Sequence, residues 1–220
     1  MAIRQVLFDL NGTLFDPMAM AEPLGGDEAE GLVERILDDT IMLAMAATLS
    51  GSYEDFSELL RAAASRRLAL AEERERLDEL MAAAKRMSPF ADARGAVEEL
   101  HAAGVRAGVL TNSSTATAAS LLSRSGLDME PVVGTEEVRA FKPDPSVYRR
   151  GVESTGYPAE EVALVSAHSW DVLGASRAGL RTAWVSRRER IAPPIGAGAE
   201  IEAPDLAGAA RQIADAAARG

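Results

Sequence analysis

Seven polar residues stand where short apolar runs of the sequence stop, or in a loop between two such runs. In chain order they are Asp9, Thr111, Asn112, Lys142, Ser166, His168 and Asp171. In an open parallel sheet, small ligands bind outside the carboxyl ends of the strands. If the apolar runs are strands, the set brings carboxylates, an ammonium, hydroxyls and an imidazole to one edge. We therefore expect a site for a small ligand there.

Each of these residues also has an ordinary structural explanation. An Asp at a strand end often caps a helix or forms a turn, and a lone Lys is usually a solvated surface charge. The polar run 111–114 could be a simple helix N-cap. We favour a site because chance rarely gives this order and separation together.

Alternating strands and helices must position these side chains. Strands are expected over residues 5–9, 105–110, 131–134, 162–165 and 182–185, the third of them weak. Helices are expected over residues 93–103 and 115–125, from Pro145, from 169 to about 178, and in the Ala-rich tail after Pro204, with 190–203 as a loop. Such alternation is typical of right-handed βαβ units. We predict an α/β fold with a Rossmann-like parallel sheet.

Residues 18–87 differ from the rest because they contain no convincing strand. They are rich in Ala, Leu, Met, Glu and Arg, which favour helices. Apolar residues continue at helical spacing from Leu70 to Ala84, and the charged run 72–76 can face solvent. We therefore expect an all-helical domain, residues 17–88, inserted into an α/β domain formed by residues 1–16 and 89–220.

Composition excludes several classes of function. The 220 residues include 23 Lys and Arg against 34 Asp and Glu, and the net charge of −11 repels phosphodiester backbones and anionic lipids. We expect neither nucleic-acid nor membrane partners, since no stretch reaches the roughly 20 apolar residues of a membrane span. No secretory signal is expected. The absence of cysteine fits a cytoplasmic protein.

Four segments resemble, in chain order, the motifs of the haloacid dehalogenase (HAD) superfamily. They are residues 8–14 (FDLNGTL), 110–113 (LTNS), 141–145 (FKPDP) and 165–171 (VSAHSWD). Within the superfamily the chain looks most like the type II (L-2-haloacid) dehalogenases, because residues 166–171 and 182–185 (TAWV) are similar to that branch. The resemblance implies the HAD fold, with the helical insert as its cap domain.

The resemblance also implies roles for individual residues. The family's nucleophile corresponds to Asp9, which displaces halide from C2 of a 2-haloacid and forms an ester that water hydrolyses. Lys142 would hold Asp9 ionised, and Ser166, His168 and Asp171 would orient the water. The implied substrate-binding residues are Leu10, Asn11, Thr111, Asn112, Arg35 and Trp170. We expect no cofactor and a small anionic substrate.

Two departures from the superfamily pattern bear on a second function, a magnesium-dependent phosphatase. Most phosphatases of the superfamily have an Asp where this chain has Asn11, and an amide cannot shuttle a proton. They also have an acidic residue where this chain has Ala167. A Mg²⁺ ion would have to rest on Asp9, the backbone of Asn11 and Asp171, fewer oxygens than it prefers. Both departures favour the dehalogenase reaction.

Two further departures concern the dehalogenase branch itself. Its members receive halide on a cap arginine, and Leu37 falls at that position here, with Arg35 about 200° around the helix from it. His168 stands where dehalogenases carry Asn, and it could accept a proton from water or only satisfy backbone groups. These losses leave open a third function, a catalytically weak binding protein. The apolar cap helix leaves room for a homodimer.

Overall fold

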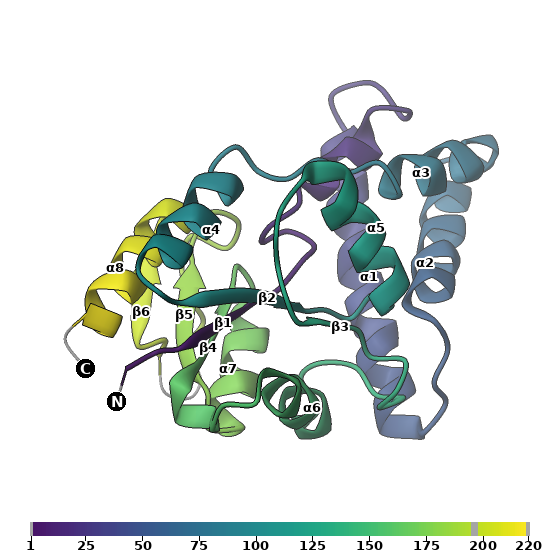
Figure 1. Cartoon of the computed structure of the whole chain (residues 1–220). Helices are drawn as coiled ribbons and strands as arrows, with labels where there is room; N and C mark the ends of the chain where they lie inside the picture. The colour runs from purple at the N-terminus through teal and green to yellow at the C-terminus, as the bar shows by residue number, and fades with distance from the viewer. Residues whose placement is uncertain (1, 195–197, 219–220) are drawn as a thin grey trace.

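Six parallel strands form the central sheet of the described chain, residues 2–194 and 198–218 of a computed structural model (Figure 1). The sheet order is β3-β2-β1-β4-β5-β6, so the chain builds one half outward from β1 and then returns to build the other half. Ligands bind where the strand order reverses in this way. The strands are β1 Gln5–Phe8, β2 Arg106–Leu110, β3 Val132–Val133, β4 Val162–Ser166, β5 Arg181–Val185 and β6 Ile201–Ala203. The predicted α/β fold with a Rossmann-like sheet is confirmed.

Helices cover both faces of the sheet because its strands are apolar on both sides. On β1, Val6 and Phe8 pack with the helices of one face, whereas Leu7 packs with those of the other. The first face carries α4 Ala93–Ala102, α5 Thr115–Ser125 and α8 Leu206–Ala218. The second carries α6 Pro145–Thr155 and α7 Ser169–Arg177, and the turn η3 Ala159–Glu161 precedes β4.

Side-chain caps fix where two of these helices begin. Asp144 accepts a hydrogen bond from the backbone N–H of Ser146, and Pro145 occupies the first helical position of α6. Ser114 accepts from the N–H of Thr117 at the start of α5. Both caps satisfy backbone donors that a helix leaves free at its N-terminus. The predicted helix start at Asp144-Pro145 is confirmed.

Residues 17–84 form a helical layer beside the sheet, at the right of Figure 1. Its elements are η1 Pro17–Ala21, α1 Ala29–Ser50, α2 Phe56–Leu70, η2 Arg74–Arg76 and α3 Leu77–Ala84. Val33, Leu68 and Leu80 are among the buried residues of a hydrophobic cluster that these helices form by themselves. We call this layer the cap, and its boundaries at residues 17 and 88 stay a prediction.

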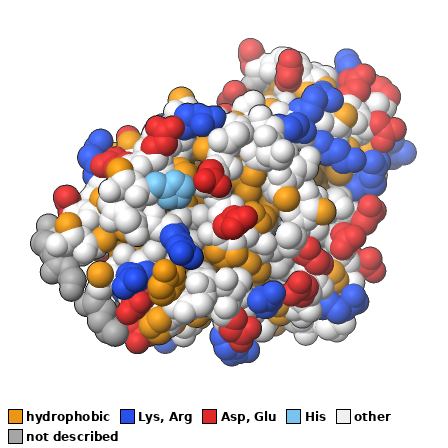
Figure 2. Space-filling view, viewed as in Figure 1, with side chains coloured by type: hydrophobic (Ala, Val, Ile, Leu, Met, Phe, Trp, Pro, Cys, Tyr) orange, Lys and Arg blue, Asp and Glu red, His pale blue; other side chains and the backbone are white. Residues whose placement is uncertain are grey.

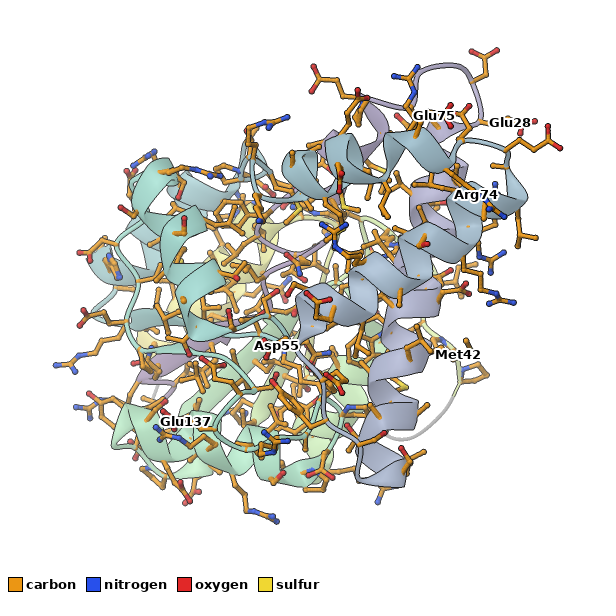
Figure 3. All side chains as sticks on the ribbon, turned by 90° about the vertical axis from the view of Figure 1, so that its right-hand side faces the viewer. Glu28, Met42, Asp55, Arg74, Glu75 and Glu137 are labelled. Carbon is orange, nitrogen blue, oxygen red and sulfur yellow. The ribbon has the colours of Figure 1, made fainter. Side chains whose placement is uncertain are left out.

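The expected helix through residues 70–84 is wrong in one respect. Glu72 has a left-handed backbone (φ 62°), so the chain leaves the helix after Leu70 and re-enters it at Leu77. Leu70, the last residue of α2, is 70% exposed. Arg74 and Glu75 project from the end of the cap (Figure 3). The apolar residues keep a helical spacing across residues 71–76, but the backbone at Glu72 is not helical, so spacing alone did not reveal the interruption.

The C-terminal region holds a strand that periodicity did not reveal. Residues 190–203 were expected as a loop, yet β6 occupies Ile201–Ala203 and pairs with β5. Three residues give too short a pattern to show a period. Positions 195–197 of that expected loop lie outside the described residues.

Acidic and basic side chains are interspersed on the face of the molecule in Figure 2. Within residues 2–194 and 198–218, no helix combines the length and the apolar character that crossing a membrane requires.

Candidate active site

A buried lysine joins two buried carboxylates at the carboxyl edge of the sheet. Lys142 Nζ lies 3.1 Å from Asp9 Oδ1 and 2.9 Å from Asp171 Oδ2. Asp9 follows β1, where its backbone N–H donates to Val165 O on the neighbouring strand β4. The side chain of Lys142 is fully buried. One ammonium therefore serves two carboxylates in a place that water hardly reaches.

The ionic pairing shifts the pKa values of Asp9 and Lys142. Burial by itself would raise the pKa of Asp9, but the charge of Lys142 and hydrogen bonds from His168 and Thr13 hold it well below its usual range. Burial would lower the pKa of Lys142, and the charges of Asp171 and Asp9 raise it instead. Both groups are therefore charged at neutral pH, so Asp9 presents an anionic oxygen.

The second oxygen of Asp9 has two partners of its own. Thr13 Oγ1 donates to Asp9 Oδ2 at 2.8 Å, and His168 Nδ1 lies 3.2 Å from the same oxygen. An ionised carboxylate only accepts hydrogen bonds, so Nδ1 of His168 must carry a proton. In the neutral imidazole, Nε2 is then free to accept one. His168 therefore combines a donor toward Asp9 with an acceptor that is still available.

Two contributors to this site were missed from the sequence. Tyr148 donates from its hydroxyl to Asp171 Oδ1 at 2.7 Å, and its own pKa lies well above the usual value because of burial and the charge of Asp171. Thr13 also accepts from the N–H of Ala167, which ties the first motif to the last. Tyr148 lies on the buried face of α6 with Val147 and Gly151. That helical spacing could have revealed it from the sequence.

Asn112 and Phe141 hold the loop that carries Lys142. Asn112 Oδ1 accepts from the backbone N–H of Lys142 at 2.9 Å. Phe141 packs against cap residues, and its ring stacks on that of Tyr53 with centroids 5.0 Å apart. Its N–H donates to Thr48 Oγ1 at 2.9 Å. The position of Lys142 thus depends on both the strand end after β2 and the cap.

Ser166 and Thr111 shape the backbone at the edge of the sheet. Ser166 Oγ accepts from the N–H of His168, and Thr111 Oγ1 accepts from the N–H of Ser113. Both side chains are buried. Their hydroxyls therefore fix the turns that present the reactive groups, and a role for Ser166 in orienting water stays a prediction.

The expected substrate-binding residues do not all gather around Asp9. Asn11 donates to Ser113 Oγ at 3.2 Å, and Trp170 stacks on the ring of His168 with centroids 5.3 Å apart. The side chain of Leu10 is buried in the hydrophobic core, so contact with a ligand is left to its backbone. Arg35 is exposed on α1 and extends along Gly31. The described contacts do not join Arg35 to Asp9.

The space between the carboxylates suits an ammonium and not a magnesium ion. Lys142 Nζ already lies between Asp9 and Asp171, the two acidic side chains that the sequence suggested as metal ligands. The amide of Asn11 is directed to Ser113. Among the residues that the structure describes, no three His, Cys, Asp or Glu side chains gather as metal ligands would. The donor set does not fit the hard, oxygen-rich coordination of Mg²⁺.

Gly12 makes room for the ring of His168, and its replacement tests that contact. Its φ is +81°, and an added Cβ would lie 3.2 Å from both Cε1 and Nε2 of His168. We expect Gly12→Ala to lower the free energy of unfolding by about 1–3 kcal/mol, from backbone strain and crowding. Urea unfolding measures the loss, and the imidazole proton NMR signals of His168 should shift.

The matched control for this variant is Gly104→Ala. Gly104 has a φ of +76°, with no atom near its added Cβ. It carries the backbone strain alone and should leave the His168 signals in place. Equal effects of the two variants on His168 would show that the contact with Gly12 has no role.

Comparison with known proteins bears on the assignment of this site. Residues 3–179 match the family described as haloacid dehalogenase-like hydrolase. The chain belongs to this family. It is 30% identical to (S)-2-haloacid dehalogenase 4A of Burkholderia cepacia over 85% of this chain and 84% of that protein. It is 35% identical to haloacetate dehalogenase H-2 of Moraxella sp. (strain B), over 38% of each chain.

The fold of this chain is also similar to that of a solved dehalogenase structure. A dehalogenase with an intermediate complex superposes with a TM-score of 0.91 at 27% identity, covering 97% of this chain and 98% of that one. The recognised HAD-like fold is thus confirmed over nearly the whole chain, and the protein is a hydrolase. Within that family, Asp9, Lys142 and Asp171 form the buried ionic centre described above.

Proposed function

We propose that this hydrolase removes halide from small 2-haloacids through an ester on Asp9. A carboxylate oxygen of Asp9 attacks C2, and the carbon–halogen bond breaks with its electron pair leaving on halide. Water then adds to Cγ of the ester, which releases the 2-hydroxy acid, one proton and Asp9 again. The names of the relatives, dehalogenases of (S)-2-haloacids and of haloacetate, support this substrate class.

The observation that carries the proposal is the state of Asp9. It is buried and ionised, and it lies beside Asn11 where a phosphatase of the superfamily has its acid. Halide leaves without a proton, whereas an alcohol leaving from phosphate needs one. An ionised carboxylate with an amide at the position of the phosphatases' acid suits a carbon–halogen bond better than a phosphate ester.

His168 is our candidate for the group that activates water in the second half of the reaction. Nδ1 donates to Asp9, and Nε2 of the neutral ring can accept a proton from a water that attacks Cγ. The ring also contacts Trp170, which fixes its plane. Formation of the ester needs no base, so His168 would act as a base in hydrolysis alone.

Replacing His168 with Phe should separate the two halves of the reaction. Phe keeps a flat ring against Trp170 but removes both nitrogens, so we expect hydrolysis of the ester to slow roughly 100-fold. One equivalent of halide should appear quickly, and mass spectrometry should find the acyl group on Asp9. His101→Phe alters the other histidine, which is exposed on helix α4, and should behave as wild type. Slow halide release without an adduct would contradict this role.

We also propose that the reaction needs no metal. The ammonium of Lys142 supplies positive charge between Asp9 and Asp171, and Asn11 and Ala167 stand where the phosphatases have acidic side chains. Turnover should therefore continue in the presence of a chelator. Loss of activity in chelator and its return with Mg²⁺ would overturn this part of the proposal.

The test of the proposed function is halide release from L-2-chloropropionate and a panel of other 2-haloacids. Incubation with chelator should give stoichiometric halide and 2-hydroxy acid. Small phosphate esters with Mg²⁺ form the parallel arm, where we expect no turnover. Hydrolysis of phosphate esters would favour the phosphatase, and inactivity in both arms would favour a binding protein.

We propose a homodimer that forms on the outer face of α1. Met42, Ala46 and Leu49 are exposed there at a spacing that places them on one stripe of the helix. Met42 points away from the neighbouring helix α2 in Figure 3. Sedimentation equilibrium of wild type and of Leu49→Glu measures the association. A monomeric wild type would exclude the dimer.

A further inference from the structure

We propose that Arg188 binds the carboxylate of the substrate, in exchange for its present partner Asp38. The inference rests on the proposed function, because it presumes an anionic substrate at Asp9. Arg188 follows β5 and belongs to the core, whereas Asp38 lies on cap helix α1. Arg188 lies outside all four motifs, so the motif comparison did not single it out.

Arg188 lines an open cleft between α1 and the carboxyl edge of the sheet. The cleft has a volume of about 420 Å³, and His168 and Trp170 form part of its wall. Arg188 is the only lysine or arginine of the described chain on that wall. An anion that enters this cleft therefore meets one cation on its wall.

His168 links the cleft to the nucleophile. Its Nδ1 lies 3.2 Å from Asp9 Oδ2, and its ring stacks on Trp170, which lines the same cleft. The side chain of His168 is thus shared between the buried ionic centre and the open space. In the proposal, the reacting carbon of the acid faces Asp9 and its carboxylate faces Arg188.

The present partner of Arg188 is a carboxylate that can be displaced. Arg188 Nη2 lies 3.2 Å from Asp38 Oδ1, and the side chain of Asp38 is 74% exposed. Exposed ion pairs contribute little to stability because water competes for both charges. A guanidinium that already holds one carboxylate offers the same forked donors to another. Asp38 therefore competes with the substrate.

The other charges near Arg188 do not replace it. Arg187 is held by Asp92 and lies over the ring of Phe90, 4.1 Å from its centroid, so its guanidinium is already engaged. Glu189 accepts from the backbone N–H of Ser169 at 3.0 and 3.1 Å, where the N-terminus of α7 offsets its charge. Glu34 is an exposed residue of the same wall. Arg188 remains the group suited to an incoming anion.

Opposite changes in KM test the exchange. Arg188→Gln should raise KM for 2-haloacids at least tenfold with a smaller change in kcat, and Arg188→Lys should lie between it and wild type. Asp38→Asn should lower KM, because it removes the competing carboxylate. If the pair served only to fasten the cap to the core, both variants would shift KM in the same direction, and that outcome would overturn the proposal.

Two surface variants provide matched controls for charge. Arg211→Gln on α8 removes an exposed guanidinium, and Glu98→Gln on α4 removes an exposed carboxylate. Both should leave KM unchanged within twofold. Shifts in these variants as large as those at Arg188 and Asp38 would show that net charge alone is responsible and would overturn the proposal.

Binding of an unreactive carboxylate separates this inference from the proposed function. Propionate has no leaving group, so calorimetric titration measures binding whether or not the protein releases halide. We expect wild type to bind propionate, Asp38→Asn to bind it more tightly, and Arg188→Gln to bind at least tenfold more weakly. Equal binding by wild type and Arg188→Gln, or none by wild type, would overturn the role of Arg188. Failure of halide release alone would overturn only the proposed reaction.

Discussion

Replacing Asp9 with Asn should lower halide release by about 10⁴-fold, equivalent to roughly 5 kcal/mol of lost transition-state stabilisation. An amide has the shape of the carboxylate but not its charge, and it cannot form the ester on which the proposed reaction depends. Thr13 and Lys142 remain, and Lys142 keeps its contact with Asp171 at 2.9 Å. The loss of activity should therefore come from kcat, in a protein that still folds although it has lost the ion pair between Asp9 and Lys142.

Two measurements distinguish this result from simple unfolding. Circular dichroism and urea unfolding should show a folded Asp9→Asn protein, and mass spectrometry after incubation with L-2-chloropropionate should show no adduct at residue 9. Asp128→Asn makes the same chemical change at an exposed site and should keep full activity. Halide release by Asp9→Asn at even a tenth of the wild-type rate would exclude Asp9 as the nucleophile.

The sheet and most of its helices could be predicted because their sequence signals are local. Apolar runs that stop at polar residues located β1, β2 and β4, and the Asp144-Pro145 pair located the start of α6. The prediction was wrong where one residue changes the path of the chain, as at Glu72. It also missed β6, whose pairing with β5 is a long-range contact that periodicity does not record.

Some residues of the candidate site could likewise be predicted from local sequence signals, and others could not. Asp9, Lys142 and Asp171 were expected together because each lies in one of the motifs, at or near the end of a strand or in a loop. The structure places Lys142 within hydrogen-bond distance of both carboxylates. Tyr148 and Arg188 were not expected. Tyr148 depends on which face of α6 meets Asp171, and Arg188 depends on how the cap lies over the core. Sequence spacing describes one element at a time, so contacts between elements escape it.

Replacing Lys142 with Met should destabilise the protein by about 3–5 kcal/mol at pH 7. The change removes a positive charge but keeps an unbranched chain of similar length. Asp9 and Asp171 are then left as two buried like charges without the ammonium that lies 3.1 and 2.9 Å from them. Domains have about 5–15 kcal/mol of stability, so the loss is a large part of the total. Urea unfolding of the two proteins measures it.

The pH dependence of that loss identifies its cause. In wild type, the pKa of Asp9 is held below its unfolded value near 3.9, so its stabilising contribution is complete above that pH and is lost as the pH falls. In Lys142→Met, burial and the second carboxylate should raise the folded pKa above the unfolded one. The variant therefore loses stability at neutral pH, where the buried carboxylate of Asp9 is charged. It regains stability as the pH falls through the raised pKa of Asp9 and that carboxylate is protonated. The difference in unfolding free energy between the two proteins should therefore shrink from pH 7 to pH 4.5.

The titration of Lys142 does not contribute to the pH dependence between pH 4.5 and 7, and Lys85, the other lysine, supplies the control. The pKa of Lys142 is raised, so its contribution is complete below the unfolded value near 10.4 and is lost only as the pH rises through the folded value. It is constant between pH 4.5 and 7. Lys85→Met makes the same substitution at an exposed residue directly after α3 and should cost little stability at either pH. A loss in Lys142→Met that stayed the same at both pH values would mean that packing, and not the charge between the two carboxylates, is what Lys142 provides.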